Sequence, residues 1–152
     1  MTYKELINSL QATIAAHVMV NTQGYGDISD IAVPESELPP DYPYVFINPQ
    51  SVNLNRNSFN CVINLICMTQ VHENVNVQTR DLDGQDICIQ ILTDIIAEYL
   101  LTIGDPLFDI AMPLTVTPFK QRLQDNVVGA TASLTMEYGK SISACVTPIN
   151  FN

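Results

Sequence analysis

The stretch PFKQRLQDNVVGATASLTMEY, residues Pro118–Tyr138, decides the fold that the sequence predicts. Its second half alternates apolar and polar residues, and this period of two is typical of a strand with one buried face. We therefore expect a strand over Val128–Tyr138. The side chains expected to point inward are Val128, Ala130, Ala132, Leu134, Met136 and Tyr138.

The first half of the stretch is charged, and it allows two interpretations. Lys120 and Arg122 are two of the chain's six basic residues, and Asp125 with Asn126 forms a typical turn pair. In one interpretation the segment is an exposed hairpin connection whose basic side chains lie in water. In the other it is also a subunit contact, because a positive patch on a chain of formal charge −10 can face a neighbour's carboxylates.

Two helices are expected upstream of this stretch. Residues Thr2–Val18 carry apolar side chains at spacings of three and four, and Thr2 with Glu5 matches a capping box. Residues Asp81–Ile103 form the strongest helical pattern of the chain, and so apolar a helix is expected at the centre of the core. Its narrow polar stripe comprises Asp83, Asp86, Gln90, Asp94 and Glu98.

Two strands are expected between the helices. Pro43–Asn48 is predicted as a short strand, followed by a polar turn region over Asn48–Asn57 and a longer strand over Ser58–Val71. One side of the longer strand is expected to face the helices with Phe59, Cys61, Ile63, Leu65, Cys67 and Val71. The other side is a candidate for cover by a partner, since it holds Val62, Ile66 and Met68. From Met112 the chain is expected to extend again as an edge strand, which tolerates its two prolines.

The expected order is helix, two strands, helix, two strands. It predicts an α+β fold, in which an antiparallel or mixed four-stranded sheet carries both helices on one face. A length of 152 residues predicts a single domain over 1–152, with a long loop at 21–42 and a C-terminal tail at 139–152. Such long loops are usually functional or poorly ordered, so loop 21–42 either lies on a neighbouring subunit or is mobile.

Composition argues against several classes of function. With 16 acidic and 6 basic residues, the chain is not expected to clamp nucleic acid by neutralising phosphates. Its four cysteines have no metal-ligand spacing and are expected to be reduced and buried, and no apolar run is long enough to span a membrane. A hydrolase that uses His72 is the enzyme alternative, but no nucleophile or phosphate-loop motif supports it. We predict no enzyme activity, catalytic residue, metal or cofactor.

A family resemblance enters with the charged segment. Phe119, Arg122, Asp125, Asn126 and Gly129 form an F-x-x-R-x-x-D-N-x-x-G pattern directly before the alternating strand. This pattern, together with the order of elements, resembles the tail-terminator and head-to-tail connector proteins of tailed bacteriophages. The sequence departs from the commoner form of that family, since alanine rather than an aromatic residue follows the glycine.

The resemblance implies a tail-terminator-like fold and a structural virion protein without catalysis. Such a protein forms a homo-oligomeric six-fold or twelve-fold ring at the neck or tail, where it joins portal or connector proteins to tail proteins. DNA passes through the lumen without sequence-specific binding, and no membrane is involved. The protein is then located in the virion, after synthesis in the cytoplasm of the host bacterium.

Ring assembly requires heterologous contacts, in which one patch meets a different patch on the next copy. The candidate segments are Asn21–Tyr42, Asn48–Asn57 and Phe119–Asn126. The residues predicted to contribute to the subunit interface are Phe119, Lys120, Arg122, Asp125, Asn126, Tyr25, Asp27 and Arg56. The alternative function is a small monomeric α+β module that binds a ligand between sheet and helices or has a regulatory role.

Overall fold

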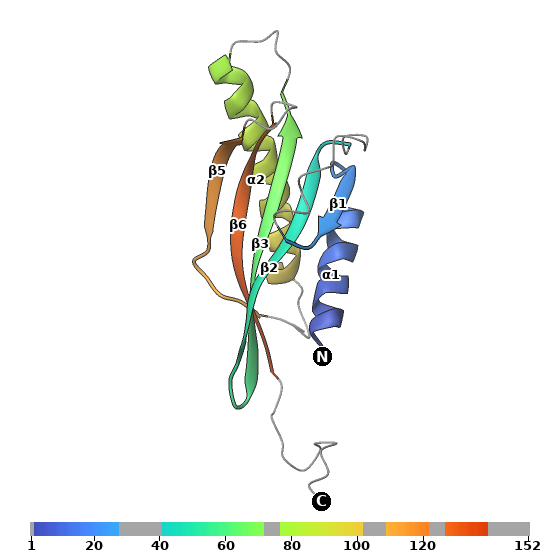
Figure 1. The fold of residues 1–152 in the computed structure, drawn as a ribbon, viewed down its shortest axis with the longest axis vertical. Helices are drawn as coiled ribbons and strands as arrows, with labels where there is room; N and C mark the ends of the chain where they lie inside the picture. The colour runs from blue at the N-terminus through green and yellow to red at the C-terminus, as the bar shows by residue number, and fades with distance from the viewer. Residues whose placement is uncertain (1, 28–40, 72–76, 102–108, 122–126, 140–152) are drawn as a thin grey trace, which may run out of the picture.

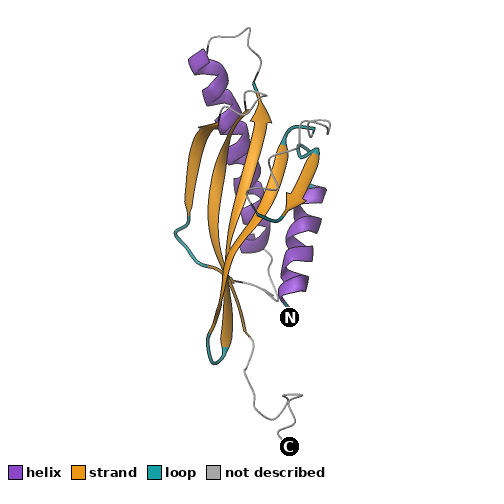
Figure 2. Cartoon of the chain, viewed as in Figure 1, coloured by secondary structure: helices purple, strands orange, loops and turns teal. Residues whose placement is uncertain are grey.

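A computed structural model describes residues 2–27, 41–71, 77–101, 109–121 and 127–139 of the chain. Within these ranges the chain forms two helices and six strands (Figures 1 and 2). In chain order they are α1 (Tyr3–Ala16), β1 (Thr22–Tyr25), β2 (Tyr44–Leu54), β3 (Ser58–Gln70), α2 (Val77–Leu101), β4 (Asp109–Ile110), β5 (Thr115–Gln121) and β6 (Val127–Gly139).

The strands form one mixed sheet in the order β1-β2-β3-β6-β4, and β5 pairs with β6 along the same edge as β4. Only β1 and β2 pair in parallel. The α+β class is therefore confirmed, whereas the expected four-stranded sheet and element order were wrong. Sequence periodicity missed β1 and β4 because strands of four and two residues are too short for an alternating pattern.

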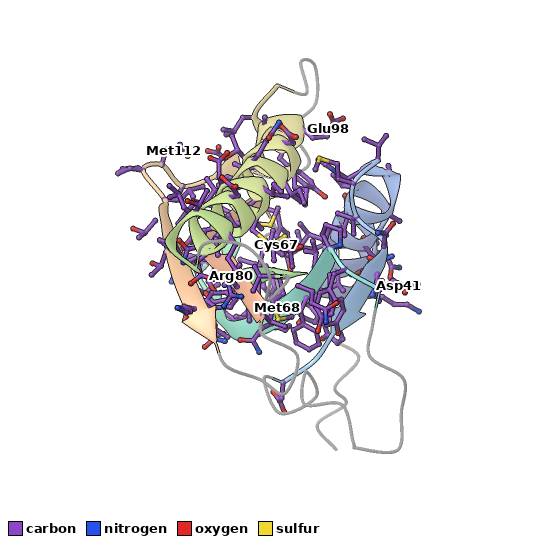
Figure 3. All side chains as sticks on the ribbon, turned by 90° about the horizontal axis from the view of Figure 1, so that it is seen from above. Asp41, Cys67, Met68, Arg80, Glu98 and Met112 are labelled. Carbon is purple, nitrogen blue, oxygen red and sulfur yellow. The ribbon has the colours of Figure 1, made fainter. Side chains whose placement is uncertain are left out.

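Both helices cover the same face of the sheet, as the view from above shows (Figure 3). The core between the layers includes Leu10 of α1, Ile91 of α2 and Leu65 of β3, all fully buried. The six residues of β6 that alternation predicted to face inward are buried as well. The long alternating strand β6 is therefore central to the sheet, because it pairs with three other strands.

Helix α1 begins with the predicted capping box. The amide of Glu5 donates to Thr2 Oγ1 at 3.2 Å, and the amide of Thr2 donates to Glu5 Oε2 at 2.6 Å. These two bonds satisfy amides that the first turn of a helix cannot pair within itself. The helix ends at Ala16, two residues before the predicted end, and Val18 is exposed.

The face of the sheet away from the helices has its own apolar cluster. It consists of the buried side chains Tyr44, Phe46, Ile66, Met68 and Val127, with Tyr42 and Phe119 packed against them. The chain alone buries Ile66 and Met68, so these two residues do not need the partner that the sequence suggested.

Strand β2 is longer than predicted, and it contains a bulge. Pro49 pairs with Ile63 and Ser51 with Val62, so the register shifts between them. The polar run after Asn48, predicted as a turn region, is therefore mostly strand. Proline is tolerated here because Pro49 lies beyond the last residue of β2 that pairs with β1, and because bulges accommodate proline.

Candidate assembly interface

The two ends of the F-x-x-R-x-x-D-N-x-x-G pattern meet in the structure. Phe119 of β5 lies directly opposite Gly129 of β6 in the antiparallel pair. A Cβ atom built on Gly129 would lie 1.9 Å from the carbonyl oxygen of Cys67 and 2.9 Å from Cζ of Phe119. Glycine is required at this position because the backbone of β3 and the Phe119 ring leave no room for a side chain. The remaining members of the pattern, Arg122, Asp125 and Asn126, lie outside the described residues.

Lys120 already has a carboxylate partner within its own chain. Its Nζ lies 2.7 Å from Oδ2 of Asp81 on α2, and Nε of Arg80 lies 3.6 Å from the other carboxylate oxygen. Nearby, Gln85 Nε2 donates to the carbonyl oxygen of Phe119 at 3.1 Å. Because these contacts tie β5 to α2, the charge of Lys120 contributes to the fold of its own chain.

Tyr25 and Asp27 lie at and just beyond the end of β1, the strand at the opposite edge of the sheet from β5. The Tyr25 hydroxyl is 3.1 Å from that of Tyr3, and Asn48 Nδ2 donates to the carbonyl oxygen of Gly26 at 3.0 Å. Burial, followed by the bond to Tyr25, raises the pKa of Tyr3, so the Tyr3 hydroxyl keeps its proton for this hydrogen bond. Asp27 is exposed.

Arg56 lies at the tip of a projecting hairpin, which we call the hairpin arm and define as residues 51–60. Every residue from Ser51 to Asn57 is exposed, so neither face of this part of the arm is covered by the body of the protein. In Figure 1 the arm extends past both helices at the lower end of the molecule. The β3 half of the arm, Ser58 to Asn60, pairs with β6, whose Tyr138 ring stacks on Phe59 with centroids 5.3 Å apart.

Two exposed apolar residues of the arm were not among the predicted interface residues. Val52 is 43% exposed and Leu54 is 62% exposed. The bulge in β2 turns both residues toward the helix side of the sheet, where they pair with Cys61 and Phe59. The sequence does show an alternation of two apolar residues with polar ones here. It was not recognised as a strand face, because this segment was predicted to be a turn region.

The exposed face of α2 is acidic, as predicted. All five members of its polar stripe are exposed, including Asp83 and Asp86 near the beginning of the helix. Leu82 interrupts this face and is 65% exposed. Farther along the helix, Asp94 Oδ2 lies 3.1 Å from Nε2 of His17, which joins the C-terminal end of α1 to α2.

The predicted interface residues therefore occupy separate places rather than one site. Phe119 and Lys120 lie on one edge strand, Tyr25 on the other, and Arg56 on the arm. This distribution suits contacts in which different patches of two copies meet.

The described residues show no arrangement that suggests metal chemistry. They contain no group of three or more His, Cys, Asp or Glu side chains able to hold a metal ion. Cys61, Cys67 and Cys88 are free and buried, as expected. No described helix is both long and apolar enough to span a bilayer. Comparison with known proteins finds no family model that matches the sequence and no matching curated protein.

Proposed function

We propose that the protein is a structural virion protein of a tailed bacteriophage, which assembles into a ring at the neck or tail. The ring joins portal or connector proteins to the tail and leaves a channel for DNA. The resemblance of the segment from Phe119 to Gly129 supports this proposal, and so does the strand pairing that places these two residues opposite each other.

The hairpin arm is the observation that carries the proposal. The outer residues of the arm, Ser51 to Asn57, are exposed, and exposed apolar side chains such as Val52 and Leu54 lower solubility without stabilising a monomer. The same features are useful where a neighbouring subunit covers the arm. A structural role in an assembly accounts for the arm better than does a monomeric binding module, which needs only the core.

The charge of the chain supports the proposed channel. With a formal charge of −10, a ring of many copies is strongly negative, and its lumen would repel the phosphates of DNA rather than hold them. Repulsion of this kind favours passage over retention.

The test is the size of the assembly formed by the purified full-length chain. Light scattering and negative-stain images are expected to show a closed ring, formed either by the chain alone or on addition of portal and tail proteins. A chain that stays monomeric and binds neither class of protein would contradict the proposal. A monomer that tightly binds a small molecule would instead favour the ligand-binding module.

A further inference from the structure

The hairpin arm differs in charge from the rest of the protein. Residues 51–60 contain Arg56 and no carboxylate, although acidic residues outnumber basic ones 16 to 6 in the whole chain. No ion pair joins Arg56 to another described residue, and its neighbours Val52 and Leu54 are exposed. The arm therefore presents two apolar side chains followed by a cation.

The first turns of α2 present the complementary arrangement. Leu82 is exposed, and Asp83 and Asp86 lie on the same side of the helix, because positions three and four apart are neighbours on a helix surface. This patch offers one apolar side chain with two carboxylates to one side of it, Asp86 nearer and Asp83 farther around the helix. Neither carboxylate has an ion pair with another described residue.

The two surfaces also match in spacing. Leu54 is the last residue of β2, and Arg56 follows it in the turn at the tip of the arm. On α2, Leu82 and Asp86 are one turn apart, or about 6 Å. With Leu54 on Leu82, the long side chain of Arg56 can reach toward Asp86, because arginine extends its charge well away from the backbone.

One copy of the chain cannot make this contact with itself. In Figure 1 the arm lies at the lower end of the long axis, whereas α2 begins at the upper end. The contact must therefore join two copies, and it is heterologous because the two surfaces differ. Repeated contacts of this type close into a ring when the rotation between copies allows it.

We propose that the hairpin arm of one copy docks on the first turns of α2 in a second copy. Val52 and Leu54 pack on Leu82, and Arg56 pairs with Asp83 and Asp86. The inference rests on the proposed function and adds to it the two surfaces that meet. It also explains how copies of a strongly acidic chain associate, because the arm supplies a local positive charge.

Charge reversal in the full-length protein tests the contact by sedimentation velocity. Arg56→Glu and Asp86→Arg should each raise the dissociation constant for self-association by roughly tenfold or more. The double variant Arg56→Glu/Asp86→Arg should restore association, because the reversed charges again attract. An arm-to-arm or helix-to-helix contact would not be restored, since like charges would then meet.

Matched controls separate this contact from general repulsion. Lys4→Glu changes the net charge as Arg56→Glu does, and Asp109→Arg, at an exposed position outside the candidate contact segments, changes it as Asp86→Arg does. Both controls should associate like the wild type, and circular dichroism should show that all variants are folded.

A crosslink provides a second measurement. Copies with Leu54→Cys, mixed with copies carrying Leu82→Cys, should form an intermolecular disulfide when diamide is added as oxidant, and neither variant should do so alone. If the protein forms rings while the charge variants and the crosslink have no effect, the arm-to-helix contact is wrong and the ring proposal stands. A chain that stays monomeric at high concentration and forms no crosslink overturns the contact, while the images with portal and tail proteins still decide the ring.

Discussion

Lys120 of β5 and Asp81 of α2 form an ion pair in which Nζ and Oδ2 are 2.7 Å apart. The Asp81 side chain is 12% exposed and that of Lys120 is 44% exposed. The pair joins the edge strand β5 to helix α2. It shows that a basic residue next to a turn can belong to the fold. The predictions below begin with this pair.

Replacing Lys120 by methionine should lower the free energy of unfolding by about 1 kcal/mol, a modest loss because the lysine is partly exposed. Asp81→Asn should lower the free energy of unfolding further, since this change removes the charge partner of both Lys120 and Arg80. Urea denaturation of the two variants checks the order. Equal stability of Lys120→Met and the wild type would show that the pair contributes nothing to folding.

Gly129→Ala should destabilise the protein by roughly 2 to 4 kcal/mol, because the new methyl group would displace the backbone of β3 at Cys67. Gly139→Ala is the matched control in the same strand, since a Cβ there meets no atom within 4 Å. Thermal denaturation of both variants should show a lower melting temperature only for Gly129→Ala. A similar fall in melting temperature for Gly139→Ala would indicate that loss of glycine flexibility in the strand, and not the clash with Cys67, destabilises the protein.

Cys67 should resist alkylation in the folded protein. A hydrogen bond with Cys88, together with burial, raises the pKa of the Cys67 thiol, so the reactive thiolate is scarce at neutral and mildly alkaline pH. Mass spectrometry after iodoacetamide treatment should find Cys67 unmodified in the native chain and modified in urea. Rapid labelling without denaturant would show that the core opens there.

Glu5 should make the stability of α1 depend on pH. Hydrogen bonds from the backbone and side chain of Thr2 hold the pKa of Glu5 below its ordinary value of 4.5. A lowered folded-state pKa means that the stabilisation is present above pH 4.5 and is lost as the pH falls through the lower folded value. In urea titrations at several pH values, Glu5→Gln should lack this part of the acid dependence. An unchanged acid profile would contradict the role of the capping box.

The double variant Val52→Ser/Leu54→Ser should weaken self-association while leaving the free energy of unfolding within about 0.5 kcal/mol of the wild type. Both side chains are exposed in the monomer, so folding gains little from them. Sedimentation and urea denaturation of the same samples separate the two effects. A large loss of stability would instead mean that the arm is part of the folding core.

The sequence by itself determined the elements whose pattern repeats over many residues. The alternation of β6, the capping box of α1 and the apolar surface of α2 are local properties, because side-chain period depends only on backbone geometry. The α+β class and the single helical layer followed from these elements.

Only the tertiary structure decided the rest. The bulge near Pro49 turned Val52 and Leu54 toward the helix side, and packing of α2 on β5 brought Asp81 to Lys120. Neither outcome is encoded locally, since a bulge is defined by the partner strand and an ion pair by two segments distant in sequence. The candidate interface was therefore predictable as a set of exposed polar segments, but the exposed arm and the acidic helix patch required the fold.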